Sequence, residues 1–357
     1  MSRILYVAFP MVVVDAAVAG GAEQVLWSLE QEMAGRRYQT SVAACAGSEV
    51  AGNLVVTGSA PEVADLFEER RAEHEQGVLA ELARAEQQGA PYDLVHDQSG
   101  HFWQRAGEID VPVLATLHLP RSLCQVRAFD STSPNVFFNC VSRSQLCSFQ
   151  DVPRMLGAVP NGIRIADFPS PALHREDYLL WVGRICEEKG PHVAIEVAER
   201  AGLPLVIAGK VHAYSYHQDY YRREIVPRID GRRVRFVDSP SFWAKLKLLR
   251  HARALLVPSL VDETSSLVAM EAGACGTPVI GFRRGAIPEI VQDGVNGFVV
   301  DTAEQMAATV AKAAAINPEA CRKYVERNFS SSRMADDYER RYLRIIRTTS
   351  QSREIAA

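Results

Sequence analysis

The sequence predicts an α/β protein made of two doubly wound, Rossmann-like domains, each with a parallel sheet. Short apolar runs that suit buried parallel strands alternate with segments of helical periodicity along the chain. The alternation starts at residues 4–8 and starts again at residues 178–182, after a stretch of linker composition at residues 163–175. The chain has 357 residues, which suffices for two domains of ordinary size.

Composition argues against several classes of protein. The chain carries 39 Lys and Arg against 43 Asp and Glu, a net charge of −4, which does not suit a nucleic-acid-binding protein. No apolar run approaches the roughly 18 residues that a membrane span requires. The first residues run straight into a strand, so we expect no signal peptide. Seven cysteines without paired spacing indicate reduced thiols and a cytoplasmic protein.

The first domain is expected over residues 1–165. Its strands are predicted at residues 4–8, 40–45, 93–96, 113–116 and 136–141, and residues 61–89 are expected to hold two acidic helices. Gly20 and Gly21 open a helix that runs to about Gly35, and they allow the backbone to approach a phosphate or sugar closely. A role in ending the strand with a turn explains the two glycines equally well. The dinucleotide-binding motif G-x-G-x-x-G is not present in the sequence.

Histidines mark the ends of two predicted strands in the first domain. His118 follows the strand at residues 113–116, and the carboxyl ends of parallel strands face the ligand crevice of such a sheet. A lone histidine is more often structural, so its position alone does not make His118 a functional residue. His96, Asp97 and His101 suggest a metal at first sight, but they lack the fixed geometry of a metal site, and we predict no metal ligands.

The second domain is expected over residues 166–333. Its strands are predicted at residues 178–182, 205–208, 236–237, 255–257, 279–281 and 298–300, and its helices at residues 191–201, 267–274, up to 314, and 318–328. Gly183 and Arg184 follow the first of these strands, and Lys189 comes shortly before the first helix. An arginine and a lysine around one strand end can both reach a single diphosphate, although surface solvation is the usual fate of such charges.

The most informative segment is residues 258–301, in which a polar turn containing Glu263 leads into a helix containing Glu271. The start of that helix is formed by Ser265, Ser266 and Leu267. The unpaired amides and the positive dipole end of a helix start suit a phosphate. A carboxylate beside them can accept hydrogen bonds from sugar hydroxyls. Periodicity alone favours the structural interpretation, with Glu263 as a turn residue and Glu271 as a solvated helix position.

This segment resembles the donor-binding segment of glycosyltransferase family 4, retaining sugar-nucleotide enzymes of the GT-B fold. The family pattern of two glutamates separated by seven residues is matched by Glu263 and Glu271. The further matching motifs are Gly276-Thr277-Pro278-Val279, Gly285-Ala286-Ile287-Pro288-Glu289, Asp293-Gly294, Asn296-Gly297, Gly20-Gly21-Ala22-Glu23, Pro160-Asn161-Gly162, Gly183-Arg184 and Glu188-Lys189-Gly190. The resemblance is dense from residue 178 to about residue 342 and thinner over residues 1–163.

The resemblance implies a GT-B fold whose two parallel sheets face each other across an interdomain cleft. The first domain would bind the acceptor, the second would bind the donor, and a terminal helix at residues 334–357 would cross back to the first domain. The implied reaction is a metal-independent, retaining transfer of a hexose-type sugar from a nucleoside diphosphate sugar to an acceptor hydroxyl, without a cofactor. A UDP-sugar or a GDP-sugar is the expected donor.

The resemblance also implies roles for single residues. Arg184 and Lys189 would stabilise the leaving diphosphate, Glu263 would hold the transferred sugar, and His118 would lie near the donor sugar and the acceptor; these four form the expected catalytic set. The expected donor-binding residues are Glu271, which would accept hydrogen bonds from the ribose, and Gly20, Gly21, Gly183, Ser265, Ser266 and Leu267. One departure stands out: Thr264-Ser265-Ser266 replaces the Pro-Phe-Gly that is usual in the family.

Alternatives remain open at this point. The altered turn makes a non-catalytic, sugar-nucleotide-binding partner subunit conceivable, and a sugar-nucleotide epimerase shares the fold. A glycoside hydrolase with Glu263 and Glu271 as its carboxylate pair is disfavoured if both are helical, because about 12 Å would separate them, beyond the ~5–9.5 Å that such pairs use. A sugar, a natural product or a lipid-linked acceptor is expected. The basic stretch at residues 222–253 could contact an anionic membrane, but its spacing favours a solvated helical face.

Overall fold

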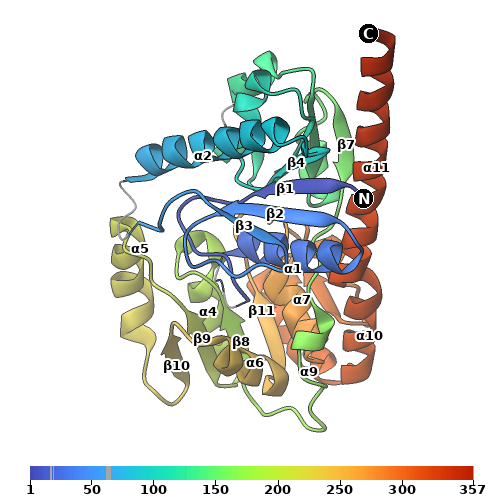
Figure 1. Ribbon diagram of the computed structural model, residues 1–357. Helices are drawn as coiled ribbons and strands as arrows, with labels where there is room; N and C mark the ends of the chain where they lie inside the picture. The colour runs from blue at the N-terminus through green and yellow to red at the C-terminus, as the bar shows by residue number, and fades with distance from the viewer. Residues whose placement is uncertain (17, 19, 62–65, 125, 357) are drawn as a thin grey trace. The chain divides into compact units, whose positions relative to one another are not determined.

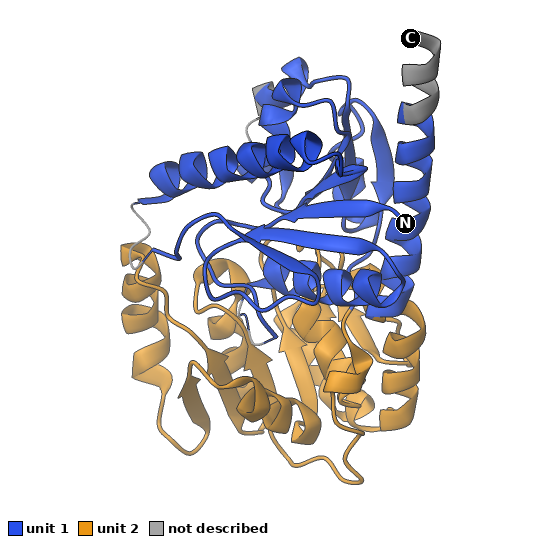
Figure 2. Ribbon diagram, in the orientation of Figure 1, with its two compact units in different colours: residues 1–162, 331–357 blue, residues 163–330 orange. Residues whose placement is uncertain are grey.

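The computed structural model describes residues 1–16, 18, 20–61, 66–124 and 126–356. The chain divides into two compact units, unit 1 with Met1–Gly162 and Ser331–Ala357, and unit 2 with Ile163–Ser330 (Figure 2). The chain passes from one unit to the other twice, after Gly162 and after Ser330. These two points lie side by side, because Ile163 and Ser330 form a parallel bridge. The sequence had placed these crossings a few residues later, at residues 165 and 333.

Unit 1 contains a seven-stranded, all-parallel sheet in the order β3-β2-β1-β4-β5-β6-β7 (Figure 1). Its strands are β1 Arg3–Val7, β2 Gln39–Ala44, β3 Asn53–Val56, β4 Leu94–Asp97, β5 Val113–Leu117, β6 Val136–Cys140 and β7 Met155–Ala158. Its α-helices are α1 Gly21–Gly35, α2 Phe67–Gln87, α3 Arg143–Cys147 and α11 Ser331–Ala356.

Two predictions for unit 1 were wrong or incomplete. Residues 61–89 were expected to hold two helices, but the described part of this stretch forms the single helix α2, and residues 62–65 lie outside the described residues. The strands β3 and β7 were not predicted, because each has only four residues and neither is a continuous buried apolar run. Both lie at the edges of the sheet, where strands are short and partly exposed.

Side chains of successive residues in the strands of unit 1 point to opposite faces of the sheet. On one face, Leu5 and Val7 of β1 pack with Val78 and Leu82 of α2 in an apolar core. On the other face, the Tyr6 hydroxyl lies 3.2 Å from the hydroxyl of Tyr342 in α11. The helix α1 packs beside α11 on unit 1 as well (Figure 1). The last helix therefore completes unit 1, as the sequence predicted.

Unit 2 contains a six-stranded, all-parallel sheet in the order β10-β9-β8-β11-β12-β13. Its strands are β8 Leu179–Val182, β9 Leu205–Gly209, β10 Val234–Asp238, β11 Ala254–Val257, β12 Val279–Phe282 and β13 Gly297–Val300. Its α-helices are α4 Pro191–Ala201, α5 Ser215–Tyr220, α6 Phe242–His251, α7 Leu267–Ala274, α8 Ile287–Ile290, α9 Ala303–Ala314 and α10 Pro318–Phe329. The predicted fold class, with two doubly wound parallel sheets, is confirmed.

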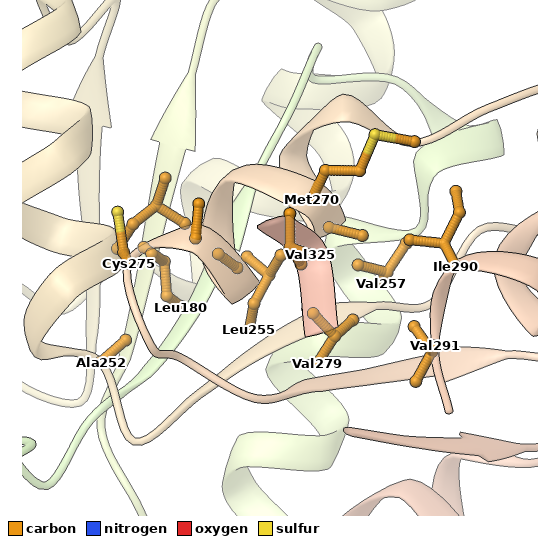
Figure 3. Packing of buried hydrophobic residues seen from close by; sticks show 14 of the residues in the cluster. Leu180, Ala252, Leu255, Val257, Met270, Cys275, Val279, Ile290, Val291 and Val325 are labelled. Atoms are coloured by element: carbon orange, nitrogen blue, oxygen red, sulfur yellow. The ribbon is translucent and has the colours of Figure 1, made fainter. Parts of the chain in front are cut away.

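The helix α7 lies at the centre of one core of unit 2. Met270 of α7 packs in a cluster with Leu255 of β11 and Val279 of β12 (Figure 3). On its other side α7 approaches α10 so closely that a Cβ added at Gly273 would lie 2.5 Å from Cγ2 of Val325. Because both sides are covered, the residues Ala269–Ala274 are all buried, which explains the small, apolar composition of this helix.

The basic residues at 222–253 do not form the single helical face that the sequence suggested. They are distributed over the π-helical turn Tyr221–Ile225, the strand β10, the helix α6 and the turns and loops between and after them. The prediction of one helical face, made from the helical spacing of the basic residues, was wrong because only the α6 part of this stretch is a regular α-helix. None of the helices in the described part of the chain combines the length and the apolar character needed to cross a membrane.

Candidate functional site

The site in unit 2 is built on two loops that follow the neighbouring strands β8 and β11. Gly190, at the end of the first loop, has a φ of 66°, and a Cβ there would lie 2.2 Å from the carbonyl oxygen of Pro258 in the second. The Leu260 amide donates a hydrogen bond of 2.8 Å to the Glu188 carbonyl oxygen. Only glycine permits this approach, so Gly190 fixes the two loops against each other.

This arrangement brings together two of the predicted catalytic residues. Nζ of Lys189 lies 2.6 Å from Oε1 and 2.7 Å from Oε2 of Glu263, and the Ser259 hydroxyl also donates to Oε1. The side chains of Lys189 and Glu263 are 25% and 10% exposed, so the pair is partly shielded from water. Their charges attract more strongly here than on an open surface.

A third loop, after β12, holds the backbone of Glu263. Gly285 has a φ of 52°, and a Cβ there would lie 2.2 Å from the Glu263 carbonyl oxygen. The Ala286 amide donates to that same oxygen at 2.7 Å, and the Gly285 amide donates to Oδ1 of Asp262 at 3.0 Å. The turn that carries Glu263 is thus fixed by hydrogen bonds from a loop distant in the sequence.

The start of α7 adjoins this turn. Ser266 is the residue before the helix, with an extended backbone (φ −141°, ψ 90°), and no side-chain bond caps the helix within the described residues. The Oγ atom of Ser265 is buried and has no hydrogen-bond partner among the residues that the structure describes. Since the Ser266 backbone is extended, the departure from the family's glycine causes no strain here, and it adds a hydroxyl beside the open helix end.

Glu271, on the second turn of α7, is paired with a residue that the sequence did not identify. Oε1 of Glu271 accepts a hydrogen bond of 2.7 Å from Nζ of Lys245 in α6. The two side chains are 5% and 16% exposed, and the Lys245 ammonium also lies 5.4 Å from the ring centre of Phe242. Glu271 is therefore a buried carboxylate with a fixed counter-charge, in contrast to a solvated helix position.

Gly183 and Arg184 begin the loop after β8. A Cβ added at Gly209, at the end of β9, would lie 1.8 Å from the Gly183 carbonyl oxygen, so this loop lies directly against the neighbouring strand. The Ile185 amide donates to the Lys210 carbonyl oxygen at 3.1 Å, which continues that contact. Arg184 itself is exposed. It is the predicted cation most accessible to a ligand from solvent.

In unit 1, His118 lies at the carboxyl end of β5, as predicted. Its Nε2 lies 2.5 Å from Oε1 of Gln98, which follows the neighbouring strand β4. Loss of hydration lowers the pKa of His118 to about 4, so the imidazole is neutral at neutral pH. A neutral ring that donates through Nε2 is a hydrogen-bonding group, not a cation, for any ligand at this edge.

The possible metal ligands of unit 1 have structural roles. Nδ1 of His96 lies 2.6 Å from the Tyr342 hydroxyl, and burial lowers the pKa of His96 well below its usual value. The Asp97 carboxylate accepts hydrogen bonds from the backbone amides of residues 99 and 103. The ring of His101 packs edge-on against the first residue of α2. These contacts explain the three side chains without a metal ion.

Gly20 and Gly21 also lie in unit 1. Gly20 precedes α1, and a Cβ there would lie 1.9 Å from Oε2 of Glu23, whose own side chain is buried. The structure thus gives a packing reason for a glycine at position 20. The closeness of these two glycines to a phosphate or sugar stays a prediction.

The comparisons with known proteins agree with this geometry. Residues 164–330, nearly the whole of unit 2, match the family model described as Glycosyl transferases group 1. The chain is similar to a D-inositol 3-phosphate glycosyltransferase of Corynebacterium efficiens, with 28% identity over 272 residues, 63% of this chain and 62% of that protein. The match thus spans just under two thirds of the length of this relative.

Solved structures show the same fold over almost the entire chain. A sucrose-phosphate synthase from Thermosynechococcus elongatus has a TM-score of 0.80 at 18% identity, covering 98% of this chain and 100% of that one. The Anabaena protein HepE in complex with UDP-glucose has a TM-score of 0.71 at 17% identity, with the same coverage. At these identities the likeness concerns the fold, and the expected GT-B fold is confirmed.

Proposed function

We propose that this chain, whose residues 164–330 match the family model Glycosyl transferases group 1, is a retaining, metal-independent hexosyltransferase acting on a nucleoside diphosphate sugar. One observation carries the proposal: Lys189 and Glu263 meet at 2.6 Å, on adjoining loops, beside the start of α7. A cation for the diphosphate, a carboxylate for sugar hydroxyls and helix-start amides for a phosphate are the groups that such a donor requires.

The nucleotide part of the donor would be held by α7. Because Lys245 holds Oε1 of Glu271, that carboxylate stays oriented to accept hydrogen bonds from ribose hydroxyls. The amides at the start of α7 and the buried Ser265 hydroxyl would bind a phosphate group. Gly183 allows the backbone after β8 to come close to the same ligand.

The leaving diphosphate would be stabilised by Arg184 and Lys189. Lys189 is bound to Glu263 in this structure, so an arriving phosphate would compete with that carboxylate for the ammonium group. When the phosphate takes Lys189, the oxygens of Glu263 become available to the hydroxyls of the transferred sugar. Stabilising the charge that develops on a leaving group typically contributes ~10²–10³ in rate per donor group.

The acceptor would bind unit 1 near Gly20, Gly21 and His118. Attack by its hydroxyl on the leaving-group face of the sugar would retain the anomeric configuration, without a protein nucleophile. The neutral imidazole of His118 is suited to hydrogen-bond a hydroxyl.

The donor and the location are also part of the proposal. The UDP-glucose complex of HepE supports a UDP-sugar, with a GDP-sugar as the second choice. A sugar, a natural product or a lipid-linked molecule would be the acceptor, and no separate cofactor is needed. All seven cysteines lie in the described residues and are free thiols, which supports a cytoplasmic location.

Calorimetric titration with UDP, GDP, ADP and TDP tests the donor site. We expect one nucleotide to bind, with affinity reduced roughly tenfold to hundredfold by Arg184→Ala or Glu271→Ala, the usual cost of a lost charge-assisted hydrogen bond. Arg200→Ala serves as a matched control, because Arg200 is an exposed arginine of the same unit, paired with Glu304. If wild type binds no nucleotide, the donor-site assignment fails.

Turnover separates the enzyme from its alternatives. In Glu263→Ala and His118→Ala we expect transfer to be lost, while nucleotide affinity is kept and, in Glu263→Ala, even raised because Lys189 is freed. Wild-type protein that binds a nucleotide but transfers no sugar to any acceptor would indicate a partner subunit. Conversion of the donor without an acceptor would indicate an epimerase.

A further inference from the structure

A group of three potential metal ligands lies in unit 2 beside the proposed donor loop. Cys186 and Glu188 belong to the loop after β8, and His217 belongs to α5. One ligand atom from each residue lies within 4.8 Å of the other two, and this is the one such group among the described residues. The sequence contains no indication of this group, because His217 is distant from the other two residues along the chain.

The described residues do not explain the environment of His217. Its side chain is fully buried, at 0% exposure, and neither ring nitrogen has a hydrogen-bond partner among the described residues. A buried polar group without a partner costs roughly 1–3 kcal/mol. Exposed rings pack around it, with the ring centres of Tyr216 and Tyr214 at 4.2 Å and 5.4 Å. An imidazole held in this way needs a partner, and the residues that the structure describes do not supply one.

We propose that Cys186, Glu188 and His217 bind a zinc ion through thiolate sulfur, carboxylate oxygen and imidazole nitrogen, with a water molecule as the fourth ligand. A soft sulfur, an imidazole nitrogen and a carboxylate together select zinc over magnesium or calcium. Around a tetrahedral zinc such atoms stand roughly 3.3–3.8 Å apart. The observed limit of 4.8 Å therefore requires a closure of about 1 Å, within the range of small side-chain rotations.

The backbone around the three residues is already fixed. The Ile185 amide donates to the Lys210 carbonyl oxygen, which ties the Cys186 loop to the chain leading into α5. The Tyr220 hydroxyl lies 2.5 Å from Nδ1 of His192, which ties α5 to α4. The ligands thus sit on elements held independently of the metal, which lowers the entropy cost of binding.

The chemistry of the three side chains suits a dication. Glu188 contributes a carboxylate oxygen, and zinc binding would displace the proton of the Cys186 thiol, because a thiol that coordinates a metal is deprotonated. Arg184, a positive charge on the same loop, is exposed.

The zinc would fix the loop that presents Arg184 and Lys189 without taking part in sugar transfer. Binding of zinc does not rest on the proposed transferase activity, since it can be measured without any donor or acceptor. Loss of nucleotide binding and loss of metal binding are therefore separate outcomes.

Cobalt substitution tests the site in the full-length protein. After removal of metal with a chelator, we expect one Co²⁺ per chain, with the near-ultraviolet charge-transfer band of a thiolate ligand. The band should disappear in Cys186→Ser and persist in Cys147→Ser, whose exposed thiol lies in unit 1 outside the group. No band in wild type, a band that survives Cys186→Ser, or a band lost in Cys147→Ser would overturn the proposal.

Zinc affinity and thermal stability provide the second measurement. Glu188→Gln and His217→Asn should weaken zinc binding by more than the ~10–100-fold that loss of an outer-shell partner costs. Zinc should raise the melting temperature of wild type and of Cys147→Ser, and leave that of His217→Asn unchanged. Because the measurement of melting temperature uses His217→Asn, it tests the zinc site even if Cys186→Ser does not fold. An equal shift in all variants would overturn the site.

Discussion

At the scale of single residues, two lysine–glutamate pairs organise the candidate site of unit 2. Lys189 binds Glu263 through both carboxylate oxygens, and Lys245 binds Glu271. The first pair is partly open to solvent and can exchange partners with a ligand. The second is nearly buried, and removing one member of a buried pair leaves the other charge without compensation. The two pairs therefore respond differently to mutation.

We expect Lys245→Met to lower the free energy of unfolding by about 3 kcal/mol, because it leaves the buried Glu271 carboxylate unpaired. Urea denaturation measures this change. Lys247→Met is the matched control, since Lys247 is exposed on the same helix, and its effect should stay within about 0.5 kcal/mol. Adding Glu271→Gln to Lys245→Met should recover part of the loss. Equal effects of the two methionine variants would show that Glu271 does not depend on Lys245.

At the scale of elements, α2 is attached to the sheet of unit 1 by a polar contact as well as by its apolar residues. Nδ1 of His74 in α2 lies 2.6 Å from the hydroxyl of Thr57, which follows β3. His74 is 1% exposed, and burial, helped by the charge of Arg70, lowers its pKa to about 4. The neutral ring is thus the form that suits the folded state.

This depressed pKa predicts a loss of stability in acid. The unfolded chain takes up a proton at His74 near pH 6.5, but the folded protein does so only near pH 4, so protons favour the unfolded state between these values. The stabilisation is complete above pH 6.5 and declines as the pH falls toward 4.

We expect the unfolding free energy of wild type to fall relative to His74→Gln by up to about 3 kcal/mol from pH 7 to pH 4. Urea unfolding of both proteins across this range gives the difference, and groups common to both proteins cancel. A difference that stays constant with pH would mean that His74 titrates normally in the folded protein.

At the scale of the whole molecule, the chain builds unit 1 from two separate segments. The helix α11 returns to unit 1 and supplies buried hydrogen-bond partners to its sheet. The Tyr342 hydroxyl meets Nδ1 of His96 at 2.6 Å, and the Tyr338 hydroxyl lies 3.1 Å from Oγ1 of Thr116. Without α11 these polar groups of β4 and β5 would lose their partners.

We therefore expect residues 163–330 to fold alone, and residues 1–162 not to fold alone. Joining residues 1–162 to residues 331–356 through a short glycine–serine linker should restore folding, because Ile163 and Ser330 are bridge partners and the two chain ends are close. Cooperative thermal melting followed by circular dichroism distinguishes these outcomes. Cooperative melting of residues 1–162 by themselves would show that α11 is dispensable for unit 1.

The fold and the loop residues of the site could be predicted because they follow from local order in the chain. Apolar runs alternating with helical segments specify strands and helices, and in a parallel sheet the loops after the strands all emerge at one edge. For this reason Arg184 and Lys189 could be predicted to lie at one strand end, the resemblance added Glu263 to the same candidate site, and the bounds of α4 and α7 coincide with the prediction. The edge strands β3 and β7 were not predicted, because each has only four partly exposed residues, too few to show a hydrophobic periodicity.

By itself, then, the sequence determined the two doubly wound parallel sheets and most of their strands and helices, and it singled out the segments proposed to carry the donor site. The tertiary structure alone decided which side chains lie together: Lys245 with Glu271, Gln98 with His118, and Tyr342 with His96 as direct contacts, and His217 within 4.8 Å of Cys186 and Glu188. Each of these contacts joins residues on different elements. Their pairing depends on the order of strands in the sheet and on the packing of helices. Neither can be derived from the spacing of residues along the chain.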